Sequence, residues 1–218
     1  MRSSAGALAL SHLYIKKPGN AVKLWIMGRL TAVSIMNTKA QAIIENLYRV
    51  PEDGKAELVN GELVLMAATG FMPGRASGEI YVSLRDYERR TRAGYALPDN
   101  VGFIVNLPNR RSFSPDAAFY RGKPTGGKFL EGAPVFAAEV RSENDYGEAA
   151  EKAMASKRKD YFAAGTLVVW DVDVLKEEVV RVYSANNPEH PQIYRCGEMA
   201  EAQSALPGWV MAVDDLLV

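Results

Sequence analysis

The chain has 218 residues, of which 48% are hydrophobic and 24% are charged, and this composition fits one ordinary globular domain. Its formal net charge is zero, but residues 1–44 contain six Lys or Arg and no Asp or Glu. Residues 45–218 therefore hold 20 basic and 26 acidic residues, a net charge of −6. A domain that coats nucleic acid through its phosphates is usually basic, so any such contact here requires positive charge to be concentrated locally.

Cysteine and histidine are too scarce for several kinds of site. The only cysteine is Cys196, and the only histidines are His12 and His190, the latter in a proline-flanked segment that we interpret as a loop. This excludes an intramolecular disulfide, a cysteine zinc site and a serine–histidine–aspartate triad. We therefore expect any metal ion to be bound by oxygen, which favours Mg²⁺ or Mn²⁺.

The N-terminal 36 residues differ from the rest in composition. They are acid-poor, yet they lack the ordered basic region, apolar core and small-residue cleavage site of a presequence. We expect a loosely ordered extension, or a start assigned too early with Met36 as the true beginning, and an organelle signal is the alternative. No apolar run reaches the roughly 20 residues that span a bilayer, so we expect a cytoplasmic domain over residues 37–218 without membrane contact.

The domain alternates between helical and strand patterns. Asn60-Gly61, between two apolar runs, predicts a β-hairpin with a type I′ turn. Ser77 is a candidate cap for a helix that runs to about Arg92. The other predicted elements are helices at 39–48 and 146–164 and strands at 101–107, 116–120, 134–140, 166–173 and 177–184. This order predicts an α/β fold in which helices flank a mixed central sheet, with the hairpin in front.

Two acidic residues lie where burial makes a carboxylate costly. Asp116 follows Pro115 at the start of one predicted strand, and Glu139 lies near the end of the next, after five uncharged residues. Two such strands side by side bring both carboxylates to one sheet edge, where they form a site for a hard cation, with the Val140 carbonyl as a third ligand. The alternative is that Asp116 caps a turn and Glu139 pairs with Arg141.

The helix at 146–164 presents one charge on an otherwise apolar stripe. At 100° per residue, the stripe holds Ala150, Met154, Lys157, Tyr161 and Ala164. Lys157 either extends its ammonium group into solvent or meets the carboxylates of the preceding strand. Two acids, a lysine and a divalent metal ion are the parts that phosphodiester hydrolysis needs. We expect Tyr161 to pack in the core, and Lys152, Arg158, Lys159 and Asp160 to form a solvated face.

The segments AELVNGELVLM, SPDAAFY, AEVRSEND and KRKDYFAAGTLVVWDVD together resemble the Uma-type restriction endonucleases of the PD-(D/E)XK nuclease superfamily. The resemblance covers about residues 40–217 and implies a restriction-endonuclease-like core and metal-dependent DNA cleavage. It identifies Asp116 as the PD acid and Glu139 as the acid of the (D/E)XK element. Glu57 matches a hairpin glutamate typical of the family, which implies that it completes the acidic cluster around the metal; the alternative is that Glu57 is an exposed hairpin charge.

The chain departs from the family pattern at two positions. Arg141 occupies the lysine position of (D/E)XK, where it can assist only as a fixed charge, and Lys157 matches a lysine moved to the following helix. Ser77 stands where relatives often have histidine. We expect Asp171 and Asp173 to terminate a strand. Two other functions stay open: a nuclease fold kept as a binding or assembly module without turnover, and a hydrolase of another phosphoester. The resemblance also implies a homodimer.

Overall fold

The computed structural model describes residues 42–50 and 54–217. The expectation for residues 1–36 and the first part of the helix predicted at 39–48 lie outside these ranges. The elements are α1 (Ile44–Leu47), β1 (Lys55–Val59), β2 (Glu62–Met66), α2 (Phe71–Thr91), β3 (Tyr95–Leu97), β4 (Phe103–Ile104), β5 (Ser112–Phe113), β6 (Ala117–Tyr120), β7 (Leu130–Glu131), β8 (Phe136–Val140), α3 (Glu148–Ala163), β9 (Val168–Val172), β10 (Val180–Ser184), β11 (Asn187–Tyr194), β12 (Met199–Glu201), β13 (Val210–Ala212) and the 3₁₀ helix η1 (Val213–Leu216).

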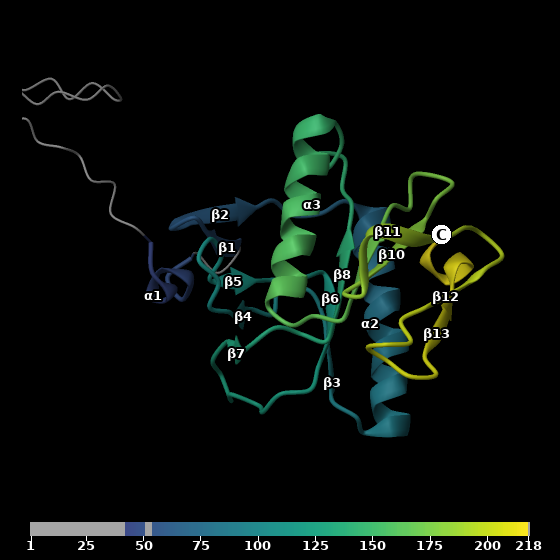
Figure 1. The fold of residues 1–218 in the computed structure, drawn as a ribbon, viewed down its shortest axis with the longest axis horizontal. Helices are drawn as coiled ribbons and strands as arrows, with labels where there is room; N and C mark the ends of the chain where they lie inside the picture. The colour runs from purple at the N-terminus through teal and green to yellow at the C-terminus, as the bar shows by residue number, and fades with distance from the viewer. Residues whose placement is uncertain (1–41, 51–53, 218) are drawn as a thin grey trace, which may run out of the picture. The chain divides into compact units, whose positions relative to one another are not determined.

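A six-stranded mixed sheet lies at the centre, in the order β11-β10-β9-β8-β6-β3 (Figure 1). Strands β8 and β9 are parallel, and the other neighbouring strands of this sheet are antiparallel. A parallel pair needs a crossover connection, and α3 provides it between β8 and β9. The structure thus confirms the predicted mixed sheet flanked by helices.

The two long helices cover opposite faces of this sheet, because neighbouring residues of β6 and β8 belong to different cores. Phe119 and Ala138 pack in the core of α2, together with β12, β13 and η1. Ala118 and Ala137 pack in the other core, which includes Tyr161 of α3. This alternation places every second residue of β6 and β8 under α3. Positions 116 and 139 are each two residues from one of these, so their side chains also lie on the α3 face of the sheet.

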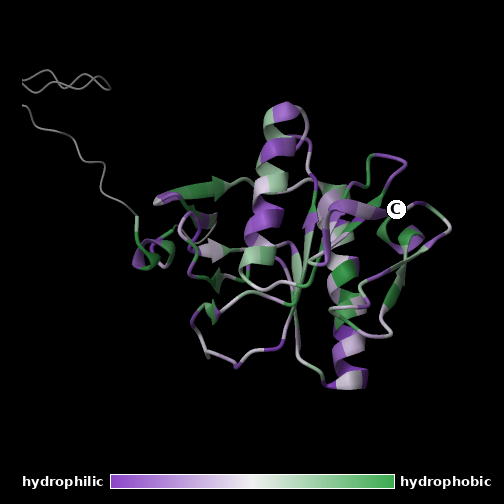
Figure 2. Ribbon diagram, in the orientation of Figure 1, coloured by the Kyte–Doolittle hydropathy of each residue, from purple (hydrophilic) through white to green (hydrophobic). Residues whose placement is uncertain are grey.

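The predicted hairpin is present as β1 and β2. Asn60 and Gly61 have φ angles of 50° and 73°, as a type I′ turn requires. Strand β2 is hydrophobic over much of its length (Figure 2), although Val64 and Leu65 are 47% and 66% exposed. Strand β1 contacts β5 of a small sheet with the order β5-β4-β7. The hairpin is therefore held beside the start of β6.

Three predicted boundaries are wrong for identifiable reasons. Helix α2 begins at Phe71 instead of Ser77, because Pro73 lies in the first turn, where the missing N–H has no helical partner in any case. His190 lies in strand β11 instead of a loop, since β11 is an edge strand and edges tolerate proline. The strand predicted at 101–107 is reduced to Phe103–Ile104. Across the described residues, no helix combines the length and apolarity needed to cross a membrane.

Candidate active site

Main-chain hydrogen bonds hold Asp116 beside the end of β8. Strands β6 and β8 are antiparallel, with Ala117 opposite Ala138. The Asp116 N–H donates to the Ala138 carbonyl at 3.0 Å, and the Val140 N–H donates to Asp116 Oδ2 at 2.7 Å. Asp116 therefore lies next to Glu139 and Val140 at one sheet edge, which is the juxtaposition that the sequence predicts.

Lys157 reaches the same edge from α3. Its Nζ lies 2.7 Å from Glu139 Oε2 and 2.8 Å from Glu57 Oε1. The Lys157 side chain is only 14% exposed, so its ammonium group ends on carboxylates instead of in solvent. The apolar stripe of α3 explains this position, since none of its members is exposed. The structure thus brings together Asp116, Glu139 and Lys157.

Glu57 joins these residues from the hairpin. It is 4% exposed, and its carboxylate pairs with Arg110 and accepts the Ser114 N–H at 2.9 Å. Burial favours the neutral acid, but attraction to Lys157 and Arg110 outweighs it and lowers the pKa of Glu57. Glu57 is therefore a buried, ionised member of the group and not an exposed hairpin charge.

Tyr161 has two roles where the sequence indicates one. Its ring is fully buried and stacks on Phe113 with 4.0 Å between centroids, as expected of a core residue. Its hydroxyl also donates to Glu139 Oε1 at 2.6 Å. Lys157 and Tyr161, one helical turn apart, thus hold one oxygen each of the Glu139 carboxylate.

Sequence reasoning missed two cations of this site. Lys55 Nζ lies 2.8 Å from Asp116 and 2.6 Å from Asp99. Lys55 is two residues from Glu57 in a strand, so the period of two could have placed both on one face. Arg110 pairs with Glu57 and, at 2.8 Å, with Asp160. Arg110 lies in an Arg-rich loop where no periodicity marks it.

Arg141 lies in a different group of charges. Its guanidinium binds Asp171 at 2.7 Å and also pairs with Glu151, and no hydrogen bond joins it to Glu139 within the described residues. Arg158 contacts Asp171 at 3.2 Å. Asp171 lies inside β9 and is 1% exposed, so it does not terminate a strand as predicted. We call Arg141, Glu151, Arg158 and Asp171 the Arg141 cluster.

The predicted solvated face of α3 is correspondingly only half right. Lys152 and Lys159 are exposed. Asp160 is buried and pairs with Arg110, while Arg158 is largely covered and lies 4.1 Å from the centroid of the Tyr183 ring. Both residues have partners distant in sequence, which helical periodicity does not reveal.

The electrostatics of Glu139 distinguish it from its neighbours. Burial, together with the nearby charges of Asp116 and Glu57, raises the pKa of Glu139 to about 7 against the opposing effect of Lys157. For Lys157, burial favours the neutral amine, but attraction to Glu139 and Glu57 outweighs it and raises the pKa. Lys157 therefore stays charged, and Glu139 titrates near neutral pH.

The donor set fits a divalent cation in charge and in atom type. Five carboxylates and three cations are linked by ion pairs, which leaves two negative charges when all are ionised; we call them the site cluster, formed by Glu57, Asp99, Asp116, Glu139, Asp160, Lys55, Arg110 and Lys157. Carboxylate oxygens are the ligands that Mg²⁺ and Mn²⁺ prefer. In the described part of the chain, no three Asp, Glu, His or Cys side chains form a ready-made metal site. Asp116 and Glu139 thus offer two ligands, and a third must come from the main chain or water.

Comparison with known proteins shows the fold and the family of this chain. The chain matches no curated protein sequence. Among solved structures it is similar to "a putative nuclease belonging to DUF820 from Anabaena variabilis ATCC 29413", with a TM-score of 0.63 and 15% identity over 79% of this chain and 95% of that one. At this identity the likeness shows a shared fold. The profile of the Uma2 family, described as "Putative restriction endonuclease", matches residues 43–214. This match covers most of the chain, and the chain therefore belongs to the Uma2 family, whose description and fold are those of a nuclease.

Proposed function

We propose that the protein is a metal-dependent endonuclease that hydrolyses phosphodiester bonds of DNA at the site cluster. The observation that carries the proposal is the convergence of Asp116 and Glu139 with the Lys157 ammonium group, 2.7 Å from Glu139. The two uncompensated negative charges of the cluster match one divalent cation. Family membership supports the same class of reaction.

In this proposal Asp116 and Glu139 hold Mg²⁺ or Mn²⁺, with the Val140 carbonyl as a third ligand. When bound, the cation activates water and neutralises charge on the scissile phosphate. Lys157 stabilises the charge that develops on the phosphoryl oxygens. Glu57 and Tyr161 keep Lys157 and Glu139 in position, since each already hydrogen-bonds or pairs with one of them. Lys55 would leave Asp116 or turn toward the phosphate as the cation enters.

The test is cleavage of plasmid, linear duplex and single-stranded DNA by the purified protein with Mg²⁺, Mn²⁺ or EDTA. We expect cleavage with either metal ion and none in EDTA. Asp116→Asn, which keeps the size of the side chain but removes its charge, should reduce cleavage to the background of the assay. Intact DNA in every wild-type reaction with Mn²⁺ would count decisively against the proposal.

A nuclease fold without turnover is the second candidate, because ion pairs with Lys55 and Lys157 already occupy the carboxylates of Asp116 and Glu139. The acidic net charge of residues 45–218 and Arg141 at the motif's lysine position favour it as well. Calorimetric titration with Mn²⁺ separates the two candidates. The nuclease should bind the ion and lose that binding in Asp116→Asn, whereas the inactive module should show no heat of binding in either protein.

The proposal also concerns the substrate range and the oligomeric state of the protein. The same residues would serve a hydrolase of RNA or of a nucleotide, so the cleavage assay includes both substrates. Cutting two strands of a duplex is simplest with two sites, and we therefore propose a homodimer, which sedimentation velocity would detect.

A further inference from the structure

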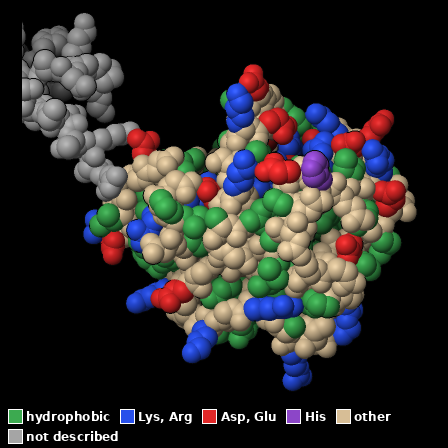
Figure 3. All heavy atoms as spheres, viewed as in Figure 1, with side chains coloured by type: hydrophobic (Ala, Val, Ile, Leu, Met, Phe, Trp, Pro, Cys, Tyr) green, Lys and Arg blue, Asp and Glu red, His purple; other side chains and the backbone are tan. Residues whose placement is uncertain are grey.

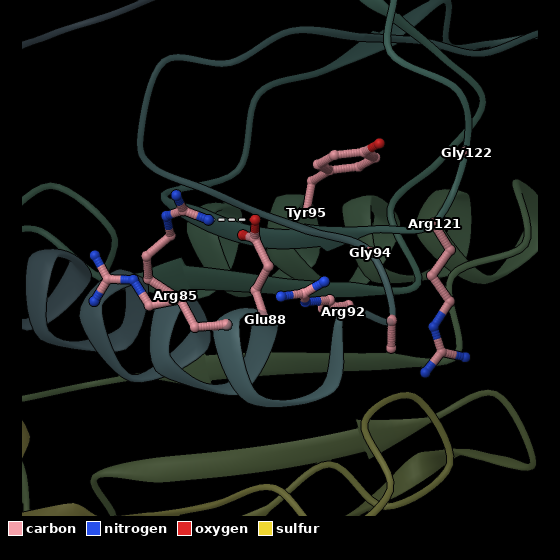
Figure 4. Close-up of a pocket in the computed structure, with 9 residues that line it drawn as sticks. Arg85, Glu88, Arg92, Gly94, Tyr95, Arg121 and Gly122 are labelled. Atoms are coloured by element: carbon pink, nitrogen blue, oxygen red, sulfur yellow. Dashed lines mark ion pairs between the residues drawn. The ribbon is translucent and has the colours of Figure 1, made fainter.

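A pocket lies at the opposite end of β6 from the candidate active site. It has a volume of about 620 Å³, is open to solvent, and is lined by the last turn of α2, the start of β3 and the residues that follow β6. Arg85, Arg89, Arg92, Tyr95 and Arg121 contribute its main side chains (Figure 4). Arg121 is five residues beyond Asp116, a separation of roughly 17 Å along an extended strand. The cavity is therefore distinct from the site cluster.

The charge of this cavity is strongly positive. Arg85 pairs with Glu88, whose other oxygen accepts the Ala96 N–H at 2.7 Å, so the one acidic side chain of the lining is fully engaged. Among the described residues, Arg92 and Arg121 have neither an ion pair nor a side-chain hydrogen bond. Figure 4 accordingly draws one ion pair, between Arg85 and Glu88. Two guanidinium groups at this cavity are thus free to bind an anion.

On the face drawn in Figure 3, basic side chains gather at the end of the molecule where this pocket lies. Blue basic side chains predominate at the lower end, where Figure 1 places the C-terminal end of α2, whereas acidic and basic side chains mix at the upper end. Residues 45–218 as a whole have a net charge of −6. The local excess of arginine is therefore the concentration of positive charge that an acidic domain needs for contact with phosphates.

Arg92 has an uncommon backbone conformation. It caps the C-terminus of α2 with φ of 52° and ψ of 29°, in the left-handed region where glycine is usually found. A residue with a side chain costs about 1 kcal/mol there. Gly94 follows two residues later and lies against β6, where a Cβ would come 2.4 Å from the Tyr120 carbonyl. The chain thus has an arginine at the strained position, and Arg121 lines the same pocket beside Gly94.

An exposed aromatic ring completes the cavity. Tyr95 is 42% exposed and lines this cavity together with an adjoining one of about 390 Å³ that contains Pro124 and Thr125. Arginine beside an exposed tyrosine is the combination that binds nucleic-acid strands, because guanidinium groups take phosphates and the ring stacks on a base.

We infer that this cavity binds a nucleic-acid strand, with Arg92 and Arg121 on backbone phosphates and Tyr95 stacked on an unpaired base. The inference rests on the proposed function, because it takes the bound strand to be the substrate of the site cluster. It assigns a contact outside the cleavage site, which anchors the strand while the site cluster acts elsewhere along it.

The test measures fluorescence anisotropy of a labelled single-stranded oligonucleotide with the full chain in EDTA, so that the metal site contributes neither binding nor cleavage. Each phosphate contact to a single strand adds about 0.7 to the slope of log K against log salt. We expect R92A/R121A to reduce this slope by about 1.4. The matched control R75A/K152A removes two cations that are ion-paired with Glu79 and Glu148 on the surface, and it should change the slope much less.

A second variant tests the identity of the ligand. Tyr95→Ala should weaken oligonucleotide binding about tenfold, a typical loss for one stacked base, and leave the binding of inorganic polyphosphate unchanged. R92A/R121A should weaken both ligands. An unchanged salt slope in R92A/R121A, or an unaltered oligonucleotide affinity in Y95A, would overturn the inference. The cleavage assay is separate: binding through this cavity without cleavage leaves the inference intact and rejects the proposed nuclease.

Discussion

Two largely buried groups of charges lie around α3 and the adjacent strands β8 and β9, and they differ in charge balance. Glu139 of the site cluster is opposite Asp171 of the Arg141 cluster in the parallel pairing of β8 and β9. The Arg141 cluster has two arginines and two carboxylates, with Arg141 Nε 2.7 Å from Asp171. The site cluster has five carboxylates and three cations.

This difference indicates that the Arg141 cluster stabilises the fold, whereas the site cluster is suited to catalysis. In the Arg141 cluster, hydrogen bonds to Asp171 and Glu151 raise the pKa of Arg141, and the hydrogen bond to Arg141 lowers the pKa of Glu151, so the charges of these two residues are fixed. In the site cluster the pKa of Glu139 rises to about 7, so one charge changes with conditions. A carboxylate that lacks a full counter-charge is poised to bind a proton or a metal ion.

The largest effect should come from breaking the balanced cluster. Arg141→Ala leaves Asp171 buried with only Arg158 nearby, and the loss of a buried ion-pair partner costs about 3–5 kcal/mol. Urea denaturation should show this loss of unfolding free energy. R141M/D171L, which removes both charges, should recover most of it. An R141A protein of normal stability that has lost cleavage would instead place Arg141 in the catalytic machinery, as the motif's lysine position implies.

The charge imbalance of the site cluster should make the free energy of unfolding depend on pH. Because the pKa of Glu139 is raised to about 7 from 4.5, the native state binds more protons than the unfolded state between these values. The resulting stabilisation is fully present below pH 4.5 and is lost as pH rises through about 7, by up to about 3 kcal/mol at 1.36 per unit. Thermal unfolding at pH 5 and pH 8 should show this decline in the wild type.

Glu139→Gln is the control for that decline. It keeps the shape of the side chain but does not titrate, so its stability should fall less between pH 5 and pH 8. Mn²⁺ should stabilise the wild type at pH 8 and leave Glu139→Gln unchanged, because binding to the native state alone raises stability. Parallel pH profiles of the two proteins would contradict the charge imbalance.

Neighbouring cations on α3 provide the next comparison. Lys157→Met should reduce cleavage on the order of 10²-fold, the usual loss when one group that stabilises the transition state is removed. The variant should still fold, since Arg110 pairs with Glu57 and Glu139 can take a proton. Arg158→Met should keep its cleavage rate but lose about 1–2 kcal/mol of unfolding free energy with the Tyr183 and Asp171 contacts. Equal loss of cleavage in both variants would mean that α3 acts only as a support.

The sequence predicts local features of this fold well and distant partners poorly. Asn60-Gly61 determines its own turn, and the apolar stripe of α3 points Lys157 at the sheet, because both depend on residues a few positions apart. Asp171 looks like a strand terminator, since the arginine that pairs with it lies 30 residues away. Lys55 and Asp116 are 61 residues apart, and only the packing of the hairpin against β5 brings them together. Asp116, Glu139 and Lys157 were therefore predictable as site residues, whereas the cations Lys55 and Arg110 were not.

The smallest expected effect concerns Tyr161, and it tests how much one hydrogen bond changes the pKa of Glu139. Tyr161→Phe keeps the stacking on Phe113 but removes the hydroxyl that donates to Glu139 at 2.6 Å. A hydrogen bond to a carboxylate favours its charged form, so its loss should move the pKa of Glu139 further up from about 7.

Mn²⁺ titration by calorimetry across pH measures this shift. Affinity should fall about tenfold in Tyr161→Phe at pH 7, a common loss when a partner of a metal ligand is removed, and recover at higher pH as Glu139 ionises. Thermal stability should change little. A pH-independent loss of affinity would mean that Tyr161 supports only the shape of the site, and the charge imbalance around Glu139 would then be governed by Asp116 and Glu57 alone.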